Sequence, residues 1–362
     1  MPSFNEIVSS YVWPVTLISC ALSLTVFFTL VGLRFFRDRI KDRKLTRQKE
    51  IQQQLLVHLS NPLKDLRNTL LKTEKDMERV AEVVPTLLRT LKGGSYQRLL
   101  DSLKEIGLYE WALKKLHNRN RPRKIAAINL IAHWLDKRVK QELIALLKDD
   151  HPLVQYAAVE ALAHTKDTTL LPVIIRVFKR QKNISIPLMS DVFQRFGNNI
   201  SEQLASYIKQ KNIPLRIKIA LLMALIQTDS IEQIISAATT LCHHKNDELR
   251  ALAYLALFEA KEPVDASLLK SGMCDSDWRV RQYTASCASH CSPLPAEILR
   301  TLLKDENWLV GLRSGQILLT YGTVGRKLLE TLAKKDDLSA ARAKMILSEY
   351  RDSSWEDAHG MA

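Results

Sequence analysis

Hydrophobic residues are distributed along this chain in two different ways. From Ile7 to Leu33 they form one run without a charged residue, whereas later they recur three and four residues apart among polar positions. A long uncharged run is typical of a helix that crosses a bilayer, and i, i+3, i+4 spacing is typical of helices with one buried face. The pattern therefore predicts an apolar N-terminal helix followed by an all-α body.

The amphipathic part of the chain is a repeat. One short motif recurs in register at seven anchor positions, which are Arg123, Val154, Ser185, Leu215, Leu249, Val280 and Val310, at spacings of 31, 31, 30, 34, 31 and 30. A residue suited to capping a helix stands three places before most anchors, and we expect these residues to be N-caps: Asn120, His151, Asn212, Asn246, Asp277 and Asn307. Four places after the anchor come mostly small residues: Ala127, Ala158, Ile219, Ala253, Thr284 and Ser314. A second apolar stretch follows in each unit, so each unit is predicted to be a helical hairpin that completes its core only by stacking on its neighbours.

The repeat resembles the HEAT family, especially the short bacterial HEAT-like units found in phycobilisome lyases. The resemblance rests on three features of the unit: the cap, a V-R or similar pair, and a small residue. The pairs are Leu215-Arg216, Leu249-Arg250 and Val280-Arg281. It covers residues 118–340, with a degenerate further unit at 338–350, and implies an α-solenoid of about seven to eight hairpins that serves as a scaffold. It also implies that Arg216, Arg250 and Arg281 form a ladder with acidic residues of adjacent units. The third unit departs most, and Pro187 and the FGNN sequence at 196 predict a kink or break there.

These patterns divide the chain into five parts. The predicted parts are a short extracytoplasmic N-terminus at 1–10, a transmembrane helix at 11–33, a basic helical juxtamembrane region at 34–94, the solenoid with its cap helices at 95–350, and a disordered tail at 351–362. The 23 residues from Tyr11 to Leu33 would span a hydrocarbon core of ~30 Å as a helix. Whether the juxtamembrane region is a free stalk, a coiled coil or packed on the solenoid stays open at this point.

Charge predicts the orientation of the apolar helix. The net charge of the whole chain is +14, and this excess is concentrated between residues 34 and 148, which hold 27 Lys and Arg against 13 Asp and Glu. Eight of these cations follow the apolar run directly: Arg34, Arg37, Arg39, Lys41, Arg43, Lys44, Arg47 and Lys49. A cleaved signal peptide would carry its cations before the apolar run, so these cations do not indicate one. The positive-inside bias places the side of the helix that carries the eight cations in the cytoplasm. We therefore expect a single-pass protein of the inner membrane with its N-terminus outside and its C-terminal domain cytoplasmic.

Composition argues against several classes of enzyme. The chain has 11 glycines and none of the glycine-rich motifs that cradle phosphates, and no zincin or nucleophile-elbow motif occurs. Five scattered cysteines do not suggest a disulfide framework. Cys287 and Cys291 share a helix face, yet small buried residues are the simpler interpretation than metal ligands. The sequence predicts neither catalysis nor a cofactor nor a metal.

Two groups of residues are candidates for binding. The first is the densest basic patch of the repeats, Arg119, Arg121, Arg123, Lys124, Lys137, Arg138 and Lys140, for which anionic lipid, nucleic acid, an acidic partner or a merely solvated turn are the alternatives. The second is the pair Trp278 and Trp308, two residues before their anchors, which either contact a partner or stack on the neighbouring repeat. Leu255 is expected to be buried.

The sequence therefore predicts a membrane-anchored scaffold that docks protein partners on its solenoid at the inner membrane. Lipid contacts would come from the bilayer span 11–33 and from the basic segments 34–49 and 119–124. A nucleic-acid-binding HEAT protein, or a HEAT-like lyase or other enzyme, is the alternative. Nucleic acid is the weaker partner because the later repeats are electrically neutral.

Overall fold

The protein is all α-helical. Its structure, a computed structural model, describes residues 4–60, 66–71 and 76–359, and every regular element in these ranges is a helix. The chain divides into two compact units, Met1–Val139 and Lys140–Ala362, and each is described by itself. The prediction of an all-α solenoid is confirmed.

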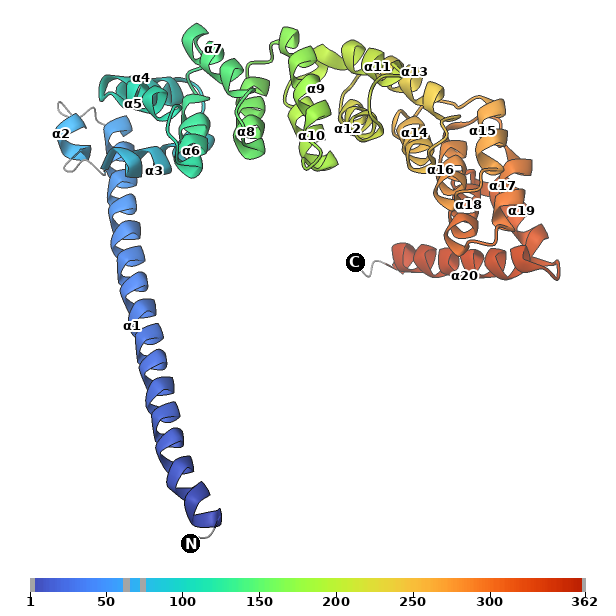
Figure 1. The fold of residues 1–362 in the computed structure, drawn as a ribbon. Coiled ribbons are helices and arrows are strands. Elements are labelled where there is room, and N and C mark those ends of the chain that lie inside the picture. The colour runs from blue at the N-terminus through green and yellow to red at the C-terminus, as the bar shows by residue number, and fades with distance from the viewer. Residues whose placement is uncertain (1–3, 61–65, 72–75, 360–362) are drawn as a thin grey trace. The chain divides into compact units, whose positions relative to one another are not determined.

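The apolar run lies in one unbroken helix, α1 (Phe4–Ser60) (Figure 1). Its stretch Thr16–Phe36 has a mean hydropathy of 2.1 over 21 residues, and none of that stretch is buried against the rest of the protein. By length and composition this stretch could cross a membrane. The predicted range 11–33 overlaps it, and the structure describes the side chains of the whole stretch Thr16–Phe36.

The C-terminal end of α1 belongs to the core of the first unit. It packs against α2 (Leu66–Leu70), α3 (Asp76–Thr90) and α4 (Gly94–Glu105), and its Ile51 and Leu55 are completely buried. The unit is completed by α5 (Leu108–Lys115) and α6 (Arg121–Ile131). The open question about the juxtamembrane region is therefore answered for the described residues: beyond Arg47 it is packed rather than a free stalk.

The second unit is a stack of helical hairpins (Figure 1). After α7 (Lys137–Leu146), the hairpins are α8 (Pro152–Ala163) with α9 (Leu171–Arg180), α10 (Ile186–Gln194) with α11 (Ser201–Lys209), α12 (Leu215–Ile226) with α13 (Ile231–Leu241), α14 (Asp247–Glu259) with α15 (Ala266–Met273), α16 (Trp278–Cys287) with α17 (Ala296–Leu303), and α18 (Trp308–Thr320) with α19 (Gly322–Ala333). First helices pack on first helices, such as α14 on α16 and α16 on α18. The final helix, α20 (Leu338–His359), packs on α18 and α19.

Most predicted helix caps are confirmed by hydrogen bonds. The side chains of Asn120, Asn246, Asp277 and Asn307 accept from backbone N–H groups of the following turn at 2.8–3.2 Å. His151 does the same at 3.3 Å. Asn212 is wrong as a cap: α12 begins after Pro214, which takes the N-cap position without a side-chain bond.

The two features that set the third unit apart both lie in regular helical structure. Pro187 is the second residue of α10, in the first turn, where a proline has no amide to lose, so it does not kink the helix. The FGNN sequence forms a short 3-10 helix at Gly197–Ile200, and Gly197 takes a φ of +73° that favours glycine. The small residues four places after each anchor are all buried, as close helix packing requires.

The predicted tail at 351–362 overlaps the last helix, since α20 runs from Leu338 to His359. Residues 360–362 of that predicted tail, like residues 1–3 of the predicted N-terminus, lie outside the described residues.

Candidate functional site

Two of the three repeated arginines form the expected ladder. Arg250 donates to both carboxylate oxygens of Asp275 at 2.7 Å, and Arg281 donates to those of Asp305 at 2.6 and 2.9 Å. These hydrogen bonds raise the pKa of each guanidinium. Arg216 departs from the prediction, because its guanidinium donates to the carbonyl oxygen of Ile184 instead of a carboxylate. The ladder is a structural feature of the last repeats.

A fourth arginine extends this ladder and was missed in the sequence. Arg342 of α20 is buried and donates to the carbonyl oxygens of Leu303 and Asp305 at 2.8 and 2.6 Å. Its guanidinium occupies the space beside Gly311, where any side chain would collide with it. Gly311 stands one residue after its anchor, where other units carry the ladder arginine. The unit of α18 has Gly311 where other units have the ladder arginine, and Arg342 of the following helix α20 occupies that space instead.

The two tryptophans each begin a helix and remain partly exposed. Trp278 starts α16 with 37% of its surface accessible, and Trp308 starts α18 with 47%. The guanidinium carbon of Arg342 lies 5.5 Å from the centre of the Trp308 ring. Trp308 therefore contacts the neighbouring helix α20 through a cation–π interaction while it keeps an open face.

The structure separates the candidate basic residues into two groups. Arg119, Arg121, Arg123 and Lys124 surround the N-terminal end of α6, whereas Lys137, Arg138 and Lys140 stand at the start of α7, beyond its C-terminal end. The 11 residues of α6 put ~16 Å between the two ends, so these residues do not form one patch.

The second group is partly neutralised by acidic neighbours. Arg138 pairs with Glu110 at 3.1 Å, and Lys140 pairs with Asp167 at 2.5 Å. The Lys140 ammonium, helped by the Thr169 hydroxyl, lowers the pKa of Asp167 to about 2. The start of α7 is therefore a poorer anion site than the start of α6.

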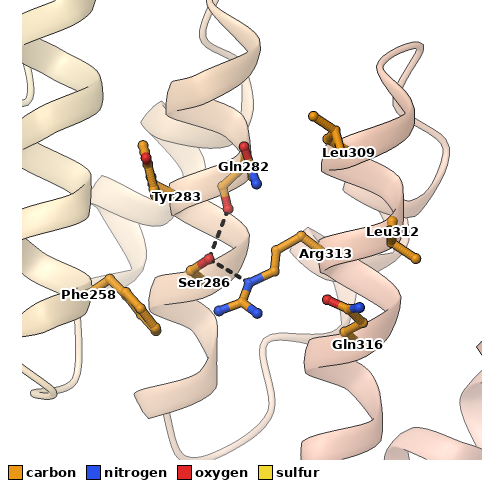
Figure 2. A pocket seen from close by; sticks show the side chains of 8 residues that line it. All are labelled: Phe258, Gln282, Tyr283, Ser286, Leu309, Leu312, Arg313 and Gln316. Atoms are coloured by element: carbon orange, nitrogen blue, oxygen red, sulfur yellow. Dashed lines mark hydrogen bonds between the residues drawn. The ribbon is translucent and has the colours of Figure 1, made fainter. Parts of the chain in front are cut away.

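A pocket of about 270 Å³ lies on the face made by first helices α14, α16 and α18 (Figure 2). Its walls are the apolar and aromatic side chains of Phe258, Tyr283, Leu309 and Leu312, and polar groups reach into it from Gln282, Ser286, Arg313 and Gln316. An apolar pocket with a few converging polar groups is the usual form of a binding site for a small group or a peptide side chain. No pattern in the sequence marks this pocket, because its residues come from three repeats.

Arg313 is the main polar group of this pocket. Its Nε donates to the hydroxyl of Ser286 at 2.8 Å, and Ser286 in turn donates to the carbonyl of Gln282 at 3.3 Å (Figure 2). The guanidinium lies 5.5 Å from the centre of the Phe258 ring, which His290 stacks against at 5.3 Å. No partner of the two terminal nitrogens is found in the described part of the chain. A carboxylate entering the pocket would meet a positioned, charged donor.

The apolar surface continues beyond the pocket along α14. Leu255 was expected to be buried, but it is only half-buried, on the same helix face as Phe258 three residues later and Leu252 three residues earlier. The core of α14 is made instead by Leu249, Ala253 and other residues on the opposite side. The hydrophobic pattern of α14 is almost continuous, and only packing shows which leucines face outward.

Two cysteines of the last repeats, Cys242 and Cys287, are buried, whereas Cys274 is exposed and Cys291 is partly buried. The thiol of Cys287 donates to the carbonyl of Tyr254 at 3.3 Å, and burial raises its pKa. Burial likewise raises the pKa of Cys242 to about 12. Within the described ranges, no three His, Cys, Asp or Glu side chains are grouped so that they could hold a metal ion.

Comparison with known proteins bears on part of the chain. Residues 109–184, from α5 to the end of the α8–α9 hairpin, match the family described as HEAT repeats. No curated protein matches the chain. A crystal structure of an engineered protein aligns with 84% of this chain and 94% of its own at 12% identity, but its TM-score of 0.24 is too low to support an argument. The family match supports the HEAT-repeat resemblance for 109–184.

Proposed function

We propose that this protein is a membrane-anchored scaffold that holds a helical-repeat docking surface at the cytoplasmic face of the inner membrane. One observation carries the proposal: α1 is a single helix that is apolar and exposed from Thr16 to Phe36 and then buries Ile51 and Leu55 in the core of the first unit. An exposed apolar stretch of this length needs a nonpolar environment. Stacked helical hairpins in turn typically provide extended binding surfaces.

Tethering gives such a scaffold a physical role. Ile51 follows Phe36 by 15 residues, so the core of the first unit begins ~22 Å beyond the apolar stretch if α1 is straight. A partner bound to the repeats is then held within the reach of the anchored chain from the bilayer. Confinement raises its effective concentration near membrane proteins without any new contact.

The pocket of α14, α16 and α18 is the proposed docking point for a protein partner. Phe258, Tyr283 and Leu312 can bury an apolar side chain, and the open nitrogens of Arg313 can pair with a carboxylate beside it. The partner segment that fits therefore combines an apolar residue with an acidic one or with a C-terminal carboxylate.

The anchor and its orientation can be tested together. The protein should stay with membranes after extraction at high pH, and a reporter fused at Ala362 should be active only if it works in the cytoplasm, because all eight flanking cations follow the apolar run. A soluble protein, or strong activity of a periplasm-dependent reporter at that position, would contradict the proposal.

The docking point needs a matched pair of variants. Leu309 lines the pocket and Val324 lies outside it on α19, and both side chains are exposed. Partners cross-linked to the full-length protein in membranes should be lost with Leu309→Asp and kept with Val324→Asp. Equal losses, or none, would show that the pocket is not where partners dock.

A further inference from the structure

The N-terminal end of α6 carries a dense group of exposed cations. It comprises the last turn of α5, the connecting turn and the first turn of α6, with Lys114, Lys115, Arg119, Arg121 and Arg123. Arg119, Arg121 and Lys114 are exposed, and the described ranges give them no acidic partner. Arg123 forms an ion pair with Glu78 at 3.5 Å, and its side chain is still 56% exposed. We name this group the α5–α6 basic end.

Polar contacts place this end beside the membrane-proximal part of α1. Arg47 of α1 binds the buried carboxylate of Asp76 at the start of α3 at 3.3 Å. The neighbouring Gln48 donates to Glu82 at 2.7 Å, and Arg123 of α6 pairs with Glu78 between those two acidic residues. The start of α6 therefore lies close to the level of Arg47 along α1.

The other end of α6 lies near the far end of α1. His133, just after α6, is bonded to Tyr96 of α4 at 3.1 Å, and Ser102 of the same helix contacts His58 at 2.9 Å. His58 stands 11 residues beyond Arg47 on α1, which is ~16 Å along the helix and close to the length of α6. Within the first unit, α6 thus runs from a membrane-proximal to a membrane-distal level.

We propose that the α5–α6 basic end is a second membrane contact of this protein, which binds the headgroups of anionic lipids. The inference rests on the proposed function, since it requires α1 to span the bilayer. Arg47 follows Phe36 by 11 residues, or ~16 Å. The headgroup layer fills ~5–7 Å of that distance, and the remainder is close to the Debye length of ~8–10 Å. A typical tilt of ~20° would bring one side of the unit closer still.

This contact fixes how α1 and the first unit together are rotated about the α1 axis relative to the bilayer. The α5–α6 basic end lies on one side of α1 only, the side on which Arg123 pairs with Glu78 of α3. Anionic headgroups attract clustered Lys and Arg near the cytoplasmic leaflet. Binding on one side therefore selects one orientation of the unit from those that a single anchor allows.

The test compares two charge-matched variants of the full-length protein in lipid nanodiscs. Arg119→Gln with Arg121→Gln removes two cations from the α5–α6 basic end, and Lys137→Gln with Arg138→Gln removes two from the distal end. Hydrogen–deuterium exchange of the 114–124 backbone amides is measured in discs of zwitterionic lipid and of lipid containing phosphatidylglycerol. Exchange is base-catalysed, so amides held at an anionic surface should exchange more slowly.

The expected result is slower exchange of 114–124 in the anionic discs for the wild type and for the distal variant, and loss of that slowing in the Arg119, Arg121 variant. High salt should remove the effect as well, because it screens the headgroups. Exchange that ignores lipid charge, or that responds equally in both variants, would overturn the inference. So would steeply salt-dependent binding of duplex DNA that the Arg119, Arg121 variant abolishes, which would assign the cations to nucleic acid. A protein that fails to enter nanodiscs would instead refute the anchor of the proposed function.

Discussion

Removing the carboxylate of Asp305 should loosen the last repeats of the solenoid. That carboxylate accepts two hydrogen bonds from Arg281, at 2.6 and 2.9 Å, and one from the backbone N–H of Asn307 at 2.8 Å. The side chains of Arg281 and Asp305 are only 11% and 8% exposed. Asp305→Ala therefore leaves a mostly buried guanidinium with only the exposed Glu306, at 3.8 Å, as a counter-charge, and a backbone amide without its acceptor.

The size of the effect follows from these contacts. Removing one partner of a buried ion pair costs ~3–5 kcal/mol. Arg281 keeps its bonds to the carbonyls of Asp275 and Ser276, and solvent reaches part of it, so we expect ~3 kcal/mol, at the lower end of that range. The matched control is Glu330→Ala, which breaks an exposed i, i+4 pair with Arg326 and should cost ~0.3–0.5 kcal/mol.

Native-state hydrogen exchange measures this locally. Repeats in a solenoid contact mainly their neighbours, so the opening free energy should fall in α16 and α18 and stay unchanged in α12. A loss of ~3 kcal/mol corresponds to a roughly hundredfold increase in opening. An increase below about tenfold, or one no larger than that of Glu330→Ala, would refute the reasoning that the ladder holds these repeats together.

Four further outcomes test other parts of the structure. Leu255→Asp should cost ~1 kcal/mol or less because the side chain is half-buried, whereas Leu249→Asp should cost several kcal/mol; comparable losses in urea denaturation would contradict the assigned faces of α14. Gly325→Ala should destabilise by ~1–3 kcal/mol because its new methyl would overlap the backbone oxygen of Leu318, whereas Gly94→Ala has open space and should be nearly neutral in the same assay. The pKa of Asp167, held at about 2 by Lys140, lies below its unfolded value, so the pair contributes stability at neutral pH that should be lost as pH falls from ~4 to ~2; a pH profile of α7–α9 unfolding should flatten in Lys140→Gln. Gly311→Ala should displace Arg342 and speed amide exchange in α20, and an unchanged α20 would show that this arginine does not hold the helix in place.

The features that the sequence predicted well depend on interactions between residues close together in the chain. A cap such as Asn246 bonds its own helix three residues later, and the small residues after each anchor record how closely helices approach. These signals lie within one unit and recur in each, so the hairpins, their number and most of their boundaries follow from them. The cap at Asn212 failed because α12 begins at Leu215, with Pro214 in the N-cap position.

The candidate site was predictable only where neighbours in sequence are also neighbours in space. The basic turn at Arg119–Lys124 is such a case, and it stands on one helix end as expected. Lys137 and Arg138 of the same predicted patch stand at the start of α7, and the 11 residues of α6 lie between them and that turn. The pocket around Arg313 and the contact of Arg342 with Gly311 each combine residues from different repeats, and no spacing in the sequence records them.

The sequence by itself determined that this protein has one apolar segment, a strongly basic segment after it and a series of helical hairpins, because each of these is a periodicity or a charge bias along the chain. The tertiary structure decided that α1 ends inside a packed core, that Leu255 faces outward, and that the ladder ends on an arginine from the following unit. The physical reason is that a helix face is buried or exposed according to what packs on it. In a solenoid that neighbour lies thirty or more residues away.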